Sequence, residues 1–126
     1  MCGPRTIYAI APAERFSSAL ESALMLREGP RVPADANETG DWLHVDVYLS
    51  KHPGYRALLF PGSRFDAGVM AWARERASTI VAVGAHVDGA ALQIGFPHSG
   101  DPLVASLVET SVAELCAAVM WLRGPG

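Results

Sequence analysis

The stretch FSSALESALMLREGPRVPADANETGDWLHVDVY, residues 16–48, joins a helix, a helix breaker and a long polar connection in one run. Ala, Leu, Met, Arg and Glu dominate it up to Glu28, with no β-branched residue, and this composition predicts a helix. Glu21 and Glu28 lie seven residues apart and therefore share one helix face. Gly29-Pro30 is typical of a helix end. Two acids on one face are usually solvated, but they could also serve an acid/base site.

The connection that follows, residues 29–40, is the longest irregular stretch of the chain. Such a stretch inside a compact domain is usually functional or forms an edge element. We expect a brief extended segment at Ala34–Glu38. The next run, Asp41–Leu49, contains His44 and alternates like a strand, but its apolar residues also fit one face of a helix. A lone histidine in such a run is more often a structural residue than a catalyst.

Short apolar runs elsewhere in the chain predict the strands of a parallel sheet. They alternate with a helix at Asp66–Ala77 and a terminal helix that begins at Asp101-Pro102. The order predicts an α/β fold, an open parallel sheet of about four to five strands flanked by helices, as in a flavodoxin-like three-layer sandwich. Residues 1–126 are expected to form a single domain. The expected strands are Thr6–Ala11, Tyr55–Phe60, Thr79–Val83 and Ala91–Phe96.

Composition excludes several classes of function. Half of the 126 residues are hydrophobic, 18% are charged and the net charge is −3, which is typical of a globular protein with a real core. Lys51 is the only lysine, and the sequence contains no basic stripe of the kind that binds nucleic acid, so we expect no nucleic-acid partner. The two cysteines, Cys2 and Cys116, give no disulfide framework and fit a reducing cytoplasm.

The segment Leu103–Leu122 is long enough to span a bilayer. Glu109 and Glu114 interrupt it, with serine and threonine between them, so we expect a buried amphipathic helix and no membrane partner.

The tetrapeptide Pro61-Gly62-Ser63-Arg64 separates an expected strand from an expected helix. Its backbone N–H groups and the Ser63 hydroxyl could hold an anion, with Arg64 as the counter-charge, although a plain tight turn explains the same residues. The following Asp66 opposes phosphate through its like charge.

The four histidines are scattered along the chain without a cysteine pair, so we expect no metal site and no cofactor. The tripeptides His44-Val45-Asp46 and His86-Val87-Asp88 are alike, and we attribute that likeness to chance.

The run ALESALMLREGPRVPADANETGDWLH resembles the second half of a sugar isomerase (SIS) domain, as in the isomerase domain of glucosamine-6-phosphate synthase. Residues 19–21 and 24–28 match the helix of that pattern, and Gly40 and His44 fall on its later glycine and histidine. The similarity in element order extends over nearly the whole chain but covers one of the two halves of such an isomerase. It also favours a helix that begins near Thr39 or Asp41, either of which could cap it.

The resemblance implies a sugar phosphate ligand and a set of catalytic residues. Glu28 matches the base that moves a proton between adjacent carbons, His44 matches a residue that reaches in from a second subunit to assist ring opening, and Glu21 orients. A homodimer, or pairing with a second SIS half, would then complete the site.

The chain departs from the family pattern at two positions within this match. Met25 stands where the family has lysine, and His44-Val45-Asp46 replaces a His-Gly-Pro element. The alternatives are therefore a catalytically inactive half-domain that acts in assembly, or a sensor that binds a sugar phosphate without turning it over.

Overall fold

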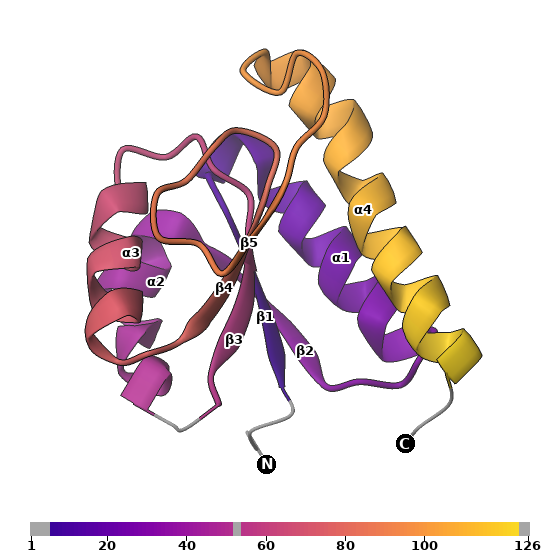
Figure 1. The fold of residues 1–126 in the computed structure, drawn as a ribbon, viewed down its shortest axis with the longest axis horizontal. Helices are drawn as coiled ribbons and strands as arrows, with labels where there is room; N and C mark the ends of the chain where they lie inside the picture. Colours follow the sequence, from indigo (N-terminus) through magenta and orange to yellow (C-terminus); the bar gives the residue numbers. More distant parts are fainter. Residues whose placement is uncertain (1–5, 52–53, 124–126) are drawn as a thin grey trace.

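A five-stranded parallel sheet forms the centre of the computed structural model, which describes residues 6–51 and 54–123 (Figure 1). The strands lie in the order β2-β1-β3-β4-β5, and every neighbouring pair is parallel. They are β1 (Ile7–Ala11), β2 (Ala34–Glu38), β3 (Arg56–Leu59), β4 (Thr79–Val83) and β5 (Leu92–Ile94). The predicted α/β fold with an open parallel sheet is confirmed.

Helices cover both faces of this sheet. They are α1 (Phe16–Glu28), α2 (Thr39–His44), α3 (Asp66–Glu75) and α4 (Pro102–Arg123), with 3-10 turns η1 (Ala13–Arg15) and η2 (Asp46–Lys51). Helices α1 and α4 lie together on one face, and α2 and α3 lie on the other (Figure 1). The core has one apolar cluster on each side, with Trp42 and Phe60 among its largest fully buried side chains.

The ambiguous run after β2 is helical, as the resemblance favoured, and continues as the turn η2. The cap differs from the prediction: the carboxylate of Glu38 accepts hydrogen bonds from the N–H groups of Gly40, at 2.8 Å, and Asp41, at 3.1 Å. A carboxylate with two oxygens can satisfy two of the free N–H groups of a helix start, so neither Thr39 nor Asp41 is needed as the cap. Cys2 lies outside the described part of the chain.

The strand order places a switch point between β1 and β3. From β1 the chain moves outward to β2, and from β3 it moves outward in the other direction through β4 to β5. Open α/β sheets bind ligands at the carboxyl ends of their strands beside such a point. The segments that leave the carboxyl ends of β1 and β3 therefore flank the place where a ligand is expected.

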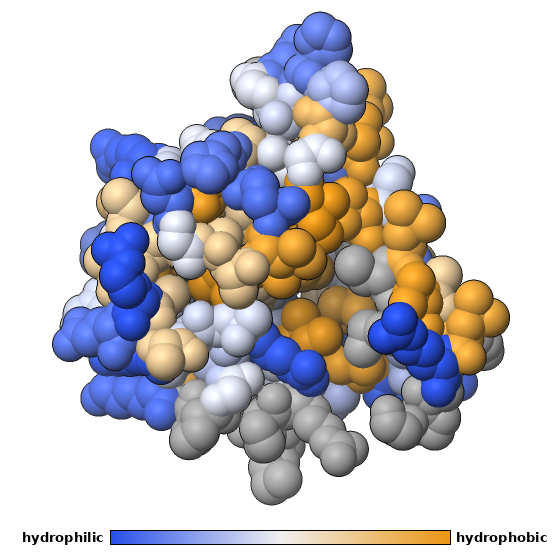
Figure 2. All heavy atoms as spheres, in the orientation of Figure 1, coloured by the Kyte–Doolittle hydropathy of each residue, from blue (hydrophilic) through white to orange (hydrophobic). Residues whose placement is uncertain are grey.

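Helix α4 is 22 residues long and buries little of its apolar surface among the described residues. Ala105 and Glu109 face the protein, whereas Leu103, Leu107 and Leu115 are each about two-thirds exposed. Figure 2 shows hydrophobic residues along this helix. Within residues 6–51 and 54–123, no helix combines the length and apolar character needed to cross a membrane.

Candidate functional site

The loop after β3 lies at the carboxyl edge of the sheet, and its N–H groups are already occupied. Asp66, the first residue of α3, accepts hydrogen bonds on Oδ2 from the N–H of Gly62, at 2.7 Å, and of Ser63, at 3.2 Å. The Asp66 carboxylate thus takes the position in which the sequence predicts an external anion. Arg64 is exposed, and its guanidinium lies 4.8 Å from the centre of the Phe65 ring. Anion binding by Gly62, Ser63 and Arg64 stays a prediction.

The environment of Asp66 opposes the charge on its side chain. Burial raises the pKa of Asp66, while the hydrogen bonds from Gly62 and Ser63 and the nearby charge of Arg15 lower it by smaller amounts. Its second oxygen, Oδ1, is buried and has no hydrogen-bond partner among the described residues. A carboxyl group of this kind at a sheet edge is a candidate for proton exchange or ligand contact.

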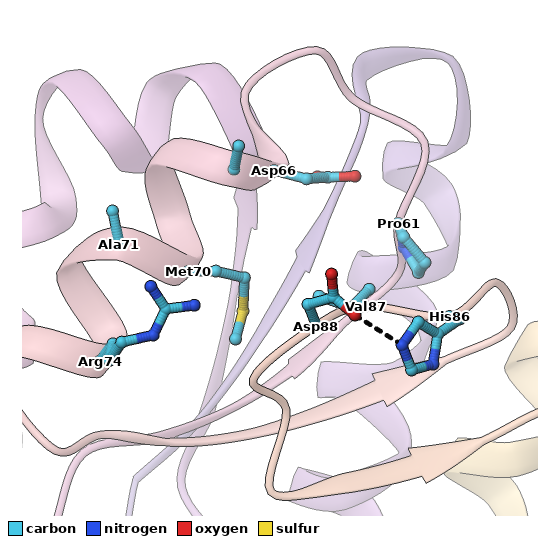
Figure 3. Close-up of a pocket in the computed structure, with 9 residues that line it drawn as sticks. Pro61, Asp66, Met70, Ala71, Arg74, His86, Val87 and Asp88 are labelled. Atoms are coloured by element: carbon cyan, nitrogen blue, oxygen red, sulfur yellow. Dashed lines mark hydrogen bonds and ion pairs between the residues drawn. The ribbon is translucent and has the colours of Figure 1, made fainter.

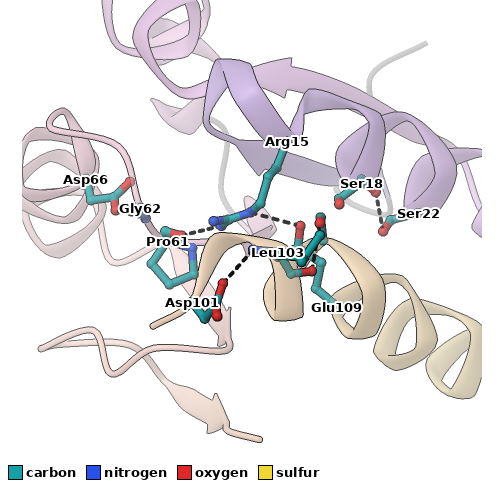
Figure 4. A network of polar contacts seen from close by, with 10 residues as sticks. Arg15, Ser18, Ser22, Pro61, Gly62, Asp66, Asp101, Leu103 and Glu109 are labelled. Carbon is teal, nitrogen blue, oxygen red and sulfur yellow. Dashed lines mark hydrogen bonds and ion pairs between the residues drawn. The ribbon is translucent and has the colours of Figure 1, made fainter. Parts of the chain in front are cut away.

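Arg15 fills the switch point itself (Figure 4). Its buried guanidinium donates from Nε to Oε1 of Glu109, at 3.1 Å, and from Nη2 to the carbonyl oxygen of Pro61. Gly62 has a φ of +136°, and a Cβ there would lie 3.1 Å from Arg15 Nη1. This ion pair therefore ties the end of β1, the loop after β3 and helix α4 together.

A cleft of about 390 Å³ opens beside this loop, between α3 and the connection from β4 to β5 (Figure 3). Met70 and Val87 give it apolar walls, and Asp66, Arg74 and Asp88 are polar groups in the lining. Its volume lies within the range of small-molecule sites. The complete lining is Pro61, Asp66, Ala67, Met70, Ala71, Arg74, His86, Val87 and Asp88.

The connection from β4 to β5 is held in place by a glutamine on β5. Gln93 accepts a hydrogen bond from the Val87 N–H, at 2.9 Å, and donates one to the carbonyl oxygen of Ala85, at 2.9 Å. His86 and Asp88 also bond to each other, with 2.8 Å between Nε2 and Oδ1. Gln93 therefore fixes the backbone of this wall, whereas the contact between the His86 and Asp88 side chains is exposed to solvent.

His44 lies beside the loop after β3. Its Nδ1 is 2.7 Å from the carbonyl oxygen of Gly40, which can only accept, so Nδ1 carries the proton in this contact. The edge of its ring meets the Phe65 ring at a centroid distance of 5.5 Å. The structure thus brings His44 into contact with Phe65, which follows Arg64 in the loop after β3.

Glu28 and Glu21 lie on α1, on the other face of the sheet from His44 (Figure 1). Helix α1 starts near the carboxyl end of β1 and runs back, so Glu28, its last residue, lies near the amino edge. Glu28 is exposed and has no hydrogen-bond or ion-pair partner within the described ranges. One chain therefore does not bring Glu28 and His44 together, and their shared catalytic role stays a prediction that needs a second subunit.

Sequence reasoning named Pro61 and Asp66, which line the cleft, but it missed Arg74 in the lining and Arg15 at the switch point. Glu109 was a usable signal, since a charge inside an apolar helix that packs on the protein needs a buried partner. No group of three or more potential metal ligands is assembled in the part of the chain that the structure describes.

The sequence matches no family model and no curated protein, whereas the fold has clear relatives among solved structures. A protein from Silicibacter pomeroyi DSS-3 that carries the name phosphosugar isomerase aligns with a TM-score of 0.71 at 18% identity, over 94% of this chain and 37% of that one. The C-terminal domain of glucosamine-fructose-6-phosphate aminotransferase from Francisella tularensis aligns with a TM-score of 0.65 at 15% identity, over 93% and 36%. The fold expected from the resemblance to SIS domains is therefore confirmed.

A third similar structure is that of the E. coli CFT073 protein c3406 in complex with a sugar phosphate. It aligns with a TM-score of 0.73 at 13% identity, over 94% of this chain and 70% of that one. The present chain spans little more than a third of the first two relatives and a larger part of this one. At these identities the likeness concerns the fold.

Proposed function

We propose that this chain is a phosphosugar-binding domain of the SIS type. The observation that carries the proposal is the cleft at the carboxyl edge of the sheet, in a fold shared with a protein named as a phosphosugar isomerase. The cleft offers a guanidinium, two carboxylates and apolar walls. A ligand that has an anionic group, several hydroxyls and a small carbon skeleton matches that lining.

The finer proposal is aldose–ketose phosphate isomerisation. Glu28 would act as the base, His44 would assist ring opening from a second subunit, and Glu21, half-buried in the middle of α1, would orient Glu28. Two observations support a shared site. Glu28 is exposed and has no partner among the described residues. His44 is also exposed, and its hydrogen bond to Gly40 uses Nδ1 and leaves Nε2 for a ligand. Gly62, Ser63 and Arg64 would contact the ligand at the rim of the cleft.

Calorimetric titration with a panel of sugar phosphates tests the binding function, with free glucose and inorganic phosphate as controls. We expect one or more sugar phosphates to bind more tightly than either control. Glu28→Gln keeps the shape of the side chain and removes the base, so it should abolish turnover and leave binding in place. Binding without turnover in the wild type would indicate the sensor, and no binding to any sugar phosphate would contradict the proposed function.

A second proposal concerns assembly, which the apolar side of α4 favours. Leu103, Leu107 and Leu115 are 68%, 71% and 67% exposed, and contiguous exposed apolar surface is typical of protein interfaces. We propose a second copy of this chain as the partner, because a twofold contact would place the same stripe on both sides of the interface. Light scattering at micromolar concentration should give the mass of a dimer, and Leu107→Glu should give a monomer. A monomeric wild type would contradict this proposal.

The proposed compartment is the cytoplasm. Cys2 and Cys116 provide no disulfide framework, which fits a reducing environment.

A further inference from the structure

Arg74 differs from the other arginines whose contacts define the fold. Arg15, Arg27 and Arg76 each donate at least one hydrogen bond to a backbone carbonyl oxygen. Arg74 is exposed on α3 at the wall of the cleft, and its guanidinium has no hydrogen-bond or ion-pair partner in residues 6–51 and 54–123. All of its donors are therefore available to a ligand.

The opposite wall leaves room for this guanidinium. Gly89 has a φ of +88°, a conformation that favours glycine, and a Cβ there would lie 3.2 Å from Arg74 Nη2. A side chain at position 89 would thus press on the arginine. The loop is shaped so that its backbone approaches the guanidinium closely.

Two carboxylates line the same cleft, yet neither pairs with Arg74. Asp66 accepts its hydrogen bonds from the loop after β3, and Asp88 bonds to His86. The close-up shows Arg74 projecting from α3 toward the side of the cleft that carries Asp88 and His86 (Figure 3). Arg74 therefore lines the cleft with a guanidinium that pairs with neither acid.

We propose that Arg74 binds the phosphate of a sugar phosphate and that Asp88, held by His86, accepts hydrogen bonds from its hydroxyl groups. The inference rests on the proposed function and gives the ligand a direction within the cleft. Arginine suits the phosphate end because its planar fork can make two parallel hydrogen bonds to phosphate oxygens. Asp88, on the wall that faces α3 (Figure 3), suits the hydroxyl groups because a carboxylate repels phosphate and accepts hydrogen bonds from hydroxyls.

The test compares Arg74→Gln, Arg74→Lys and Asp88→Asn in titrations followed by NMR. The probes are inorganic phosphate and the tightest binder among glucose 6-phosphate, fructose 6-phosphate and ribose 5-phosphate. Arg74→Gln should weaken both probes by about 10- to 100-fold, the effect of losing hydrogen bonds to a charged group. The affinity of Arg74→Lys for both probes should lie between those of Arg74→Gln and the wild type, because lysine keeps the charge but lacks the planar fork of arginine. Asp88→Asn should weaken binding of the sugar phosphate and leave binding of inorganic phosphate unchanged.

Arg31→Gln is the matched control, because Arg31 is an exposed arginine between α1 and β2, at the other edge of the sheet. It should bind both probes like the wild type. If Arg74→Gln binds the sugar phosphate as tightly as the wild type does, the inference is wrong while the proposed function stands. If the wild type binds none of the three sugar phosphates, both are wrong. The Arg74 variants should keep the wild-type circular dichroism spectrum, since glutamine and lysine are good helix formers.

Discussion

The two carboxylate oxygens of Asp66 have different environments. Its Oδ2 closes the loop after β3 by accepting the N–H groups of Gly62 and Ser63, while Oδ1 is buried without a partner among the described residues. The hydrogen bonds from Gly62 and Ser63 stabilise the charged form of the carboxylate, whereas burial destabilises that charged form. Because burial is the larger cause, the pKa of Asp66 is raised above its ordinary value of 3.8.

This shift makes stability depend on pH. A raised pKa means that the native protein binds the proton more tightly than the unfolded chain does, so the contribution of Asp66 to the free energy of unfolding falls as pH rises above 3.8. Asp66→Asn keeps an oxygen that can accept the two N–H groups and removes the charge. We measure the melting temperature of both proteins at each pH and subtract the wild-type value from that of Asp66→Asn. This difference should increase from pH 3 toward neutrality. A difference that stays constant over this range would contradict a raised pKa.

The ion pair of Arg15 and Glu109 acts at the scale of elements, because it joins η1, α4 and the loop after β3 (Figure 4). Both side chains are almost fully buried, so removing one of them leaves the other as an uncompensated buried charge. Glu109→Leu or Arg15→Met alone should therefore cost about 3–5 kcal/mol of stability in urea unfolding.

The double variant separates the ion pair from the packing around it. Arg15→Met with Glu109→Leu removes both charges, and it should recover most of the loss seen in either single variant. Glu114→Leu, an exposed position on the same helix, should change stability by about 0.5 kcal/mol or less. Additive losses in the double variant would show that the two residues do not stabilise the fold as a pair.

Strands and long helices could be predicted from the sequence because their signals are local. Apolar runs such as Thr79–Val83 are short and continuous, and the strand there has the predicted bounds. The helix up to Glu28 was predicted for the same reason, since composition and the Gly29-Pro30 breaker agree. The cap of α2 was missed because Glu38 belongs to the preceding strand and becomes a cap only through its side-chain geometry.

The cleft and the switch point could not be predicted, because their residues meet only through the tertiary fold. Arg15 and Glu109 lie 94 positions apart. Arg74 and Gly89 come together because α3 and the connection after β4 lie side by side at one edge of the sheet. The loop at Gly62 was located correctly, but the sequence could not show that Asp66 occupies its N–H groups.

At the scale of the whole molecule, the candidate binding and catalytic residues are divided between the carboxyl edge and the amino edge of the sheet. The carboxyl edge carries the cleft, the loop after β3 and His44, whereas Glu28 lies toward the amino edge. The proposed binding would therefore need one chain, and the proposed isomerisation would need a second copy or a second half to bring Glu28 to the ligand. The two functions can be separated by experiment.

Mapping sugar phosphate binding by two-dimensional NMR on the labelled protein tests the central claim most directly. We predict that glucose 6-phosphate, or the tightest binder of the panel, shifts the backbone amide signals of residues 62–66 and 84–89, which border the cleft. The amide signals of Gly29, Arg31 and Val32, at the amino edge, should stay in place. Shifts confined to the amino edge, or no shift at millimolar ligand, would contradict a sugar phosphate site at the carboxyl edge of this sheet.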